Sequence, residues 1–354
     1  MSGGNGARAV DLLEKLVAIP SVTGDEAALL DFVEERCRPA GWTAEWTDVT
    51  PGRRNLFLHR GRASVVFMTH ADTVPPFVPP RRQGGLLHGR GACDAKASLA
   101  AMAVALGELA REHADVGLLV LVGEERGSDG ALAANRRPHH ARFIVGGEPT
   151  GNRFIAGGKG AVRVAAAARG VATHSSQPES GRSAVLPLLD FLEDLRALTW
   201  PEDPVFGRTT ANIGVLEAGT APNVVAESAR AEVLFRTGVP AERVLELLAP
   251  IAEGRVELSV PYRSDPVLFR CPRGRAGEIV SFACDLPLLP AWGEPILVGP
   301  GSILDAHAAE EKVDLEQVEK AVLLYIELAR GLLERGEEYL EPRKAFMERS
   351  RQGL

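Results

Sequence analysis

The sequence predicts an α/β protein in which helices cover both faces of a mixed sheet, with a second, smaller domain inserted into the first. Three apolar runs indicate the sheet. Residues 64–69, 116–123 and 143–147 are almost continuously hydrophobic, as expected of strands that are buried on both faces. A second domain is expected because 354 residues exceed what one hydrophobic core usually serves.

The N-terminal elements are predicted from hydrophobic periodicity. Residues 1–8 show none and are expected to be disordered. Two helices follow, the first with Leu13 and Leu16 on its apolar face, and short strands are expected at residues 43–49 and 54–60. A Pro-rich loop follows the first buried strand, and a long Ala-rich helix separates that strand from the second.

Residues 159–262 are predicted to form the inserted domain, between residues 1–158 and 263–354 of the first domain. Strands and helices follow one another here in the order βαββαβ. This order is typical of a ferredoxin-like split unit. The last long helix belongs to the first domain again, with Asp314 as its cap and Gln317 as the capping-box partner.

Polar side chains follow each of the three apolar runs. The first run ends in His70 and Asp72, the second in Glu124 and Glu125, and the third in Glu148. In open α/β sheets, ligand sites gather outside the carboxyl ends of the strands. His70 and Asp72 lie two positions apart and should face the same side, as a metal-binding imidazole and the carboxylate that orients it would. Of the two adjacent glutamates, one can bind metal while the other stays free as a general acid or base.

Asp94, at the entrance of the Ala-rich helix, and His307 complete the candidate metal site. With His70, Glu125 and Glu148 they give two imidazoles and three carboxylates, a donor set that suits zinc, cobalt or manganese. One carboxylate can bridge two ions through its two oxygens. The alternatives are that Asp94 only caps the helix and that Glu148 is only a turn residue.

The composition excludes several classes of function. A net charge of -7 argues against a nucleic-acid partner, which normally meets a basic face. No apolar run approaches the ~20 residues that a membrane span needs, and the N-terminus lacks a signal-peptide pattern. Four scattered cysteines exclude a cysteine-based zinc site and give no reason to expect disulfides, so the cytoplasm is the expected compartment.

A series of short motifs runs along residues 9–330. They are Ile19–Gly24, His70–Val74, Gly89–Lys96, Glu124-Glu125 with Gly127-Ser128, Gly147–Thr150, Gly158–Gly160, Thr173–Ser176, Pro222–Val225 and Gly299–Gly301 with His307 and Glu311. In this series the chain resembles the co-catalytic zinc exopeptidases, the family of acetylornithine deacetylase, succinyl-diaminopimelate desuccinylase, aminoacylase and glutamate carboxypeptidase. Three positions depart from the family pattern without removing a ligand: Thr69, Ala97 and Arg182.

The resemblance implies a zinc-exopeptidase-like catalytic domain with two divalent metal ions, zinc first and cobalt or manganese as alternatives. Asp94 matches the carboxylate that bridges the ions. His70 and Glu148 match the ligands of one ion, and Glu125 and His307 match those of the other.

The resemblance also implies roles for residues around the metals. Glu124 matches the general base, and Asp72 matches the carboxylate that orients the first histidine. His174, in the inserted domain, matches a residue that reaches the active site of a partner subunit, so the inserted domain is expected to act as a lid and to mediate homodimerisation. Alternatively, His174 is an ordinary surface histidine. Three further positions match residues of the substrate pocket: Asn223, Arg236 and Gly301.

The expected activity is hydrolysis of an amide bond in a small N-acyl amino acid. A hydroxide shared by the two metals would attack the amide, with Glu124 as the base. Segment 299–307 is most similar to acetylornithine deacetylase, which favours that branch of the family and a place in amino-acid biosynthesis. The alternatives are a dipeptidase or carboxypeptidase with the same metal centre, and a non-catalytic relative that binds a small ligand.

Overall fold

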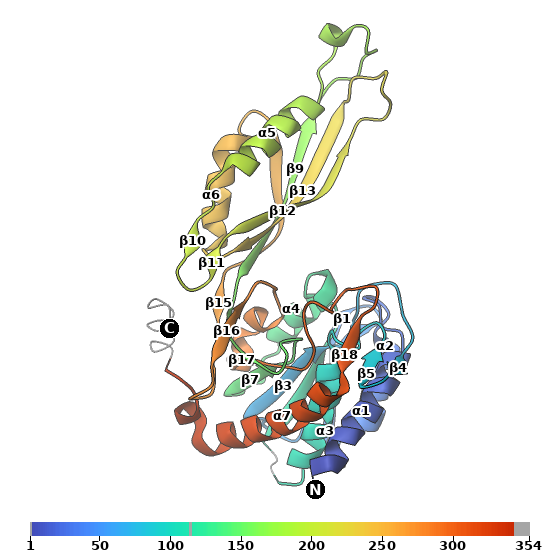
Figure 1. Ribbon diagram of the computed structural model, residues 1–354, viewed down its shortest axis with the longest axis vertical. Helices are drawn as coiled ribbons and strands as arrows, with labels where there is room; N and C mark the ends of the chain where they lie inside the picture. Colours follow the sequence, from blue (N-terminus) through green and yellow to red (C-terminus); the bar gives the residue numbers. More distant parts are fainter. Residues whose placement is uncertain (1, 113–114, 343–354) are drawn as a thin grey trace. The chain divides into compact units, whose positions relative to one another are not determined.

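The computed structural model describes residues 2–112 and 115–342, which form two compact units (Figure 1). Within these residues, the second unit comprises residues 157–268 and 279–283, and the first unit comprises the rest. The predicted domain boundaries, at residues 158/159 and 262/263, remain a proposal about which segments fold independently. The tail from residue 343 to 354, assigned above to the first domain, lies outside the described residues.

The larger sheet is mixed and has the order β1-β2-β6-β3-β7-β17-β8-β15, with β16 paired to β8. Strands β6, β3, β7 and β17 are mutually parallel, whereas β1 and β8 run antiparallel to their neighbours. The strands are β1 (Thr43–Thr50), β2 (Arg53–His59), β3 (Val65–His70), β6 (Val116–Leu121), β7 (Phe143–Gly146), β8 (Phe154–Gly158), β15 (Val267–Leu268), β16 (Gly277–Val280) and β17 (Glu294–Leu297). A separate small sheet has the order β18-β5-β4, from β4 (Arg81–Gln83), β5 (Leu86–His88) and β18 (Lys312–Asp314).

Helices cover this sheet, as the sequence predicts. Figure 1 shows α1, α3 and α7 side by side, and on this face Phe67 of β3 packs its ring against Tyr325 of α7, with 5.5 Å between centroids. On the opposite face, Phe57 of β2 packs edge-on against Trp292 at 5.1 Å. The helices are α1 (Ser2–Ala18), α2 (Ala27–Cys37), α3 (Lys96–Leu109), α4 (Asp129–Asn135) and α7 (Leu315–Arg335). Burial on both faces explains why the central strands read as continuous apolar runs.

The N-terminal residues correct one expectation. Helix α1 begins at Ser2, although residues 1–8 lack hydrophobic periodicity and are expected from the sequence to be disordered. Gly6 lies directly against α7: a Cβ there would be 2.9 Å from the Cβ of Glu319. Close packing of α1 on α7, with Ala9 and Leu13 fully buried, therefore outweighs the weak helix propensity of glycine.

The second unit has the predicted βαββαβ order. Its sheet has the order β12-β13-β9-β14, and α5 and α6 pack on it through a core that includes Phe191, Val233 and Phe235. The elements are β9 (Gly160–Arg169), α5 (Val185–Ala197), β12 (Thr210–Ala218), β13 (Ser228–Thr237), α6 (Ala241–Ala252) and β14 (Glu257–Ser264), with a short ribbon of β10 (Glu202–Asp203) and β11 (Gly207–Arg208). Among the described residues, no helix combines the length and apolar character that crossing a membrane requires.

The parallel centre of the first sheet determines where the polar residues gather. Because β6, β3, β7 and β17 run in one direction, their carboxyl ends meet at the same edge. His70 ends β3, and the segments that contain Glu124, Glu148 and His307 follow β6, β7 and β17. The sequence predicts three strands at this edge, one from each apolar run. The structure adds a fourth strand, β17, which comes much later in the chain.

Candidate metal centre

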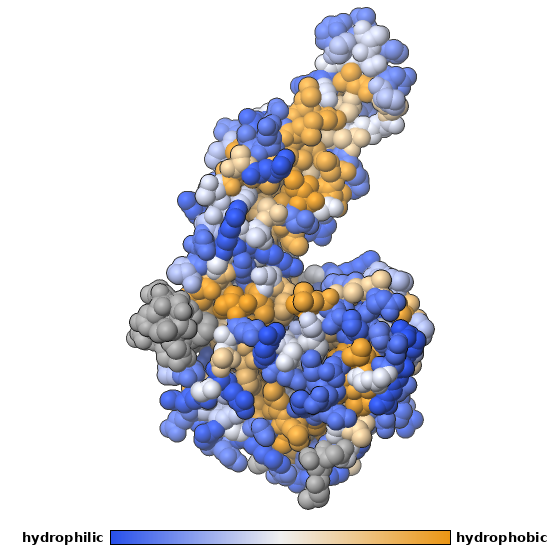
Figure 2. Space-filling view, viewed as in Figure 1, coloured by the Kyte–Doolittle hydropathy of each residue, from blue (hydrophilic) through white to orange (hydrophobic). Residues whose placement is uncertain are grey.

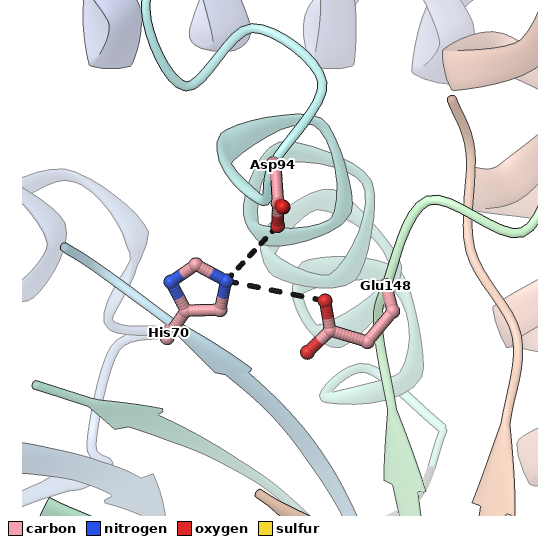
Figure 3. Close-up of side chains that lie close together, drawn as sticks. All are labelled: His70, Asp94 and Glu148. Carbon is pink, nitrogen blue, oxygen red and sulfur yellow. Dashed lines mark hydrogen bonds and ion pairs between the residues drawn. The ribbon is translucent and has the colours of Figure 1, made fainter. Parts of the chain in front are cut away.

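A first group of candidate ligands comes from β3 and two loops. His70 Nε2 lies 3.1 Å from Oδ1 of Asp94 and 4.0 Å from Oε2 of Glu148, and the three side chains point toward one another (Figure 3). All three residues are buried. Nδ1 of His70 lies 3.0 Å from the backbone carbonyl of Asp72, which can only accept, so Nδ1 carries a proton and Nε2 faces the other ligands.

A second group shares Asp94 with the first. His307 Nε2 lies 2.9 Å from Oε1 of Glu125 and 3.5 Å from Oδ2 of Asp94. In each group the possible donor atoms lie within 4.8 Å of one another. Asp94 directs Oδ1 to one imidazole and Oδ2 to the other, which is the arrangement that a carboxylate bridging two ions needs.

The chemistry of both groups fits divalent metal ions. Each offers one imidazole and two carboxylates, the ligands that zinc, cobalt and manganese accept. Burial raises the pKa of the Glu148 carboxyl well above its usual range, because crowded and desolvated carboxylates resist ionisation. Burial alone would lower the pKa of His70, but the contacts with Asp72 and Asp94 raise it well above its ordinary value. Divalent cations would relieve this excess of negative charge.

Asp72 does more than the sequence predicts. Its carboxylate accepts the backbone N–H groups of Glu124 at 3.0 Å and Glu125 at 3.1 Å, together with the hydroxyl of Thr23 at 2.7 Å. The same carboxylate is 3.5 Å from Nδ1 of His70, which lowers the pKa of Asp72 despite its burial. Asp72 therefore fixes both the first imidazole and the turn that follows β6.

Glu124 and Glu125 do not end a strand but form a short 3-10 helix, η1 (Glu124–Arg126). The tight helix turns successive side chains in different directions, so Glu125 contacts His307 while Glu124 is left out of both ligand groups. Although part of Glu124 faces solvent, the packing around its carboxyl raises its pKa well above the usual range. Such a carboxyl can hold a proton near neutral pH and can act as an acid or a base.

A buried ion pair missed by the sequence analysis fixes Asp94. Asp94 does not cap α3, whose N-cap is Ala95. Its loop is held by Glu311 instead: one carboxylate oxygen accepts the N–H groups of Cys93 at 3.0 Å and Asp94 at 3.1 Å, and the other lies 2.8 Å from Arg90. Arg90 and Glu311 are 4% and 3% exposed. The motif around His307 includes Glu311, but nothing local reveals a partner 221 residues away.

Gly301 lies against the same loop. Its backbone has φ +92°, and a Cβ there would be 2.6 Å from the sulfur of Cys93. Its N–H donates to the side-chain oxygen of Gln317 at 2.9 Å. The prediction that Gln317 is a capping-box partner is therefore wrong. Asp314 does cap α7, as predicted, by accepting the N–H of Glu316. The place of Gly301 beside Asp94 requires glycine both for φ and for space.

Comparison with known proteins identifies the family. A family model described as a peptidase dimerisation domain matches residues 156–256. A peptidase M20 domain-containing protein of Schizosaccharomyces pombe is 34% identical over 328 residues, which cover 88% of this chain and 82% of that protein. The chain belongs to the M20 peptidase family. A protein of Aspergillus clavatus named as a probable carboxypeptidase is 32% identical over 369 residues, covering 90% of this M20 chain and 88% of the relative.

Solved structures share the M20 fold. A tripeptidase from Staphylococcus aureus superposes with a TM-score of 0.76 at 20% identity, covering 92% of this chain and 99% of that one. A protein of Bacillus subtilis described as a dinuclear metal binding peptidase from the M20 family superposes with a TM-score of 0.68 at 16% identity, covering 94% and 99%. The family-level resemblance is thus confirmed, and these relatives are named as peptidases rather than as acetylornithine deacetylases.

The remaining predicted site residues of this M20 chain lie in the second unit. His174 and Asn223 are neighbours there, since the N–H of Ser175 donates to the carbonyl of Asn223 at 3.0 Å. Arg236 lies at the opposite end of β13, paired with Ala161. One chain therefore does not bring Arg236 together with the other two residues, and the roles of all three remain predictions.

Asp285 is a buried acid that the sequence analysis did not single out. It is 1% exposed, and neither carboxylate oxygen makes a well-formed hydrogen bond among the described residues, although the Ser128 side chain partly offsets the effect of burial. Burial raises the pKa of Asp285 from 3.8 to about 7. Between these values the unfolded chain binds fewer protons than the folded chain, so stability falls as pH rises from about 4 to about 7.

Asp285→Asn should therefore stabilise the metal-free protein at pH 8 but not at pH 4. A shift of about three pKa units corresponds to at most about 4 kcal/mol. Thermal unfolding with a chelator present, at both pH values, measures the difference. An equal change in Tm at pH 4 and pH 8 would contradict the assignment.

Proposed function

We propose that this M20 peptidase hydrolyses the amide bond of a small peptide substrate with a free C-terminal carboxylate, as a carboxypeptidase or dipeptidase. The observation that supports this most directly is the pair of ligand groups that share Asp94, with Glu124 beside them on the turn of Glu125. The names of the similar relatives favour a peptide substrate over the N-acyl amino acid preferred on sequence grounds.

In this proposal His70 and Glu148 would hold one ion, Glu125 and His307 would hold the other, and Asp94 would serve both. Zinc is the expected metal, with cobalt or manganese as alternatives. When bound, two such ions supply an acidified water and a polarised carbonyl.

Glu124 moves the proton in the reaction. It accepts a proton as the water oxygen bonds to the carbonyl carbon, and it donates that proton to the nitrogen as the C–N bond breaks. Its raised pKa suits both transfers near neutral pH. Asp72 keeps Glu124 in place through the backbone of the turn.

We further propose a homodimer formed through the second unit. The matching dimerisation model supports it, as do exposed apolar side chains on this unit, which Figure 2 shows in orange. Leu186 and Leu216 are 63% and 54% exposed, and β12 is an edge strand of its sheet. In the dimer His174 would stabilise the oxyanion in the partner's site, while Asn223, Arg236 and Gly301 would contact the substrate. The free state of all four cysteines supports a cytoplasmic location.

A substrate panel tests the reaction. Zinc- and cobalt-loaded protein is given dipeptides and tripeptides, the same peptides with C-terminal amides, and N-acetyl amino acids. We expect the free-carboxylate peptides to be cleaved fastest and the amidated ones to be poor substrates. Faster cleavage of N-acetyl amino acids would instead support the deacylase that segment 299–307 suggests, and no cleavage by the loaded protein would contradict hydrolysis altogether.

A further inference from the structure

Arg53 at the start of β2 joins two carboxylates from distant parts of the first unit. Its guanidinium contacts Glu26 through Nη2 at 2.9 Å and Nε at 3.1 Å, and Asp129 through Nη1 at 2.6 Å and Nη2 at 3.2 Å. Glu26 is 1% exposed, and the side chain of Arg53 is 15% exposed. Both contacts are bidentate; the contact with Glu26 is shielded from solvent, whereas the Asp129 side chain is 42% exposed.

The contacts of Arg53 with Glu26 and Asp129 lie against the turn that contains Glu124. Asp129 is the first residue of α4 and follows η1 after two residues. Gly123, immediately before η1, has no room for a side chain: a Cβ there would be 2.0 Å from Oδ1 of Asp129 and 2.6 Å from Nη2 of Arg53. The Arg53 guanidinium and the Asp129 carboxylate therefore lie directly against the backbone of Gly123, where the turn begins.

Asn55, two residues further along β2, fixes both ends of the same turn. Its side chain donates to the carbonyl of Gly130 at 2.8 Å and accepts the N–H of Val122 at 3.1 Å. On the other side, the Asp72 carboxylate accepts the first two N–H groups of η1. The turn is thus held by Asp72 on the side of the candidate ligands and by Arg53 and Asn55 of β2 on the other side.

We propose that Arg53 is a positioning residue for the metal centre: its bidentate contacts with Glu26 and Asp129 set the orientation of the turn that presents Glu124 and Glu125. The inference rests on the proposed function for the roles of these two glutamates. Arginine is required because its planar guanidinium can form bidentate hydrogen bonds with two carboxylates at once. A lysine ammonium keeps the positive charge but cannot form these bonds. A displacement of about 1 Å in a catalytic group can reduce the rate about 100-fold.

Arg53→Lys is the test, with Arg54→Lys as the matched control. Arg54 is the next residue, is exposed, and stacks over Trp46 at 4.2 Å on the other face of the strand. We expect Arg53→Lys to lower kcat about 10- to 100-fold with KM changed less than about 2-fold, and Arg54→Lys to resemble the wild type.

The visible absorption spectrum of bound cobalt gives a readout independent of turnover. Because Glu125 is a proposed ligand, a tilted turn should change the band positions in Arg53→Lys but not in Arg54→Lys. Wild-type protein that binds no cobalt and hydrolyses nothing would overturn the proposed function. An active wild type together with an Arg53→Lys variant of wild-type kcat and spectrum would overturn the role of Arg53 alone.

Asp129→Asn provides a second route if Arg53→Lys folds poorly. The single variant should show the same loss of kcat and the same spectral change. If the two residues act as one unit, the double variant should lose little more than either single variant. Fully additive losses would contradict a shared positioning role.

Discussion

Replacing Glu124 with glutamine is expected to remove most of the hydrolysis while both metal ions stay bound. Glutamine has nearly the same shape but can neither take a proton from water nor give one to the leaving nitrogen. General acid–base catalysis contributes about 10²- to 10⁴-fold, so kcat should fall by that amount. Glu124 belongs to neither ligand group, and the metal content should therefore stay at the wild-type value.

The matched control for this variant is Glu125→Gln, one residue away. Glu125 contacts His307 within the second ligand group, so its loss should reduce bound metal as well as activity. Mass spectrometry of metal content after dialysis, with kcat on the same samples, separates the two. Full activity of Glu124→Gln would refute the mechanism, and loss of metal from it would make Glu124 a ligand instead of a base.

Asp94→Asn is expected to have the second large effect, because Asp94 alone serves both ligand groups. Asparagine keeps one oxygen and replaces the other with an amide nitrogen that cannot bind metal, so the bridge is lost. Both ions should bind weakly, and activity should fall below detection in a standard assay. His307→Ala should weaken only the second group, which leaves His70 and Glu148 with Asp94 in the first.

Titration of cobalt into the metal-free proteins measures this difference. The wild type should bind two ions per chain, His307→Ala one ion with unchanged affinity, and Asp94→Asn neither ion tightly. If Asp94→Asn still bound two ions as the wild type does, Asp94 would not bridge them. Circular dichroism of each metal-free variant checks that the fold is retained.

The sequence was informative where the physical signal is local. Apolar runs that end in histidine or carboxylate identify strands and their ligand edge, because burial and polarity both appear within a few residues. The sequence could not show that Glu311 joins Arg90 or that Arg53 joins Asp129, since these pairs form only when distant segments meet. Their side chains look like ordinary surface charges in the sequence.

One prediction was wrong where a tertiary contact replaced a local rule. Gln317 has capping-box spacing, yet it accepts a hydrogen bond from Gly301. The helix cap considered for Asp94 as an alternative to metal binding is likewise absent, because its carboxylate faces His70. In both cases a local bond was possible, but the folded chain offered the side chain a partner far away in sequence.

The position of β17 has a consequence for how the chain is made. Strands β7 and β8 follow one another in sequence, but β17 lies between them in the sheet. A ribosome therefore synthesises the whole second unit before residues 294–297 can fill this place. His307 follows β17, so the candidate ligand group of Asp94, Glu125 and His307 is completed only after the second unit has been synthesised.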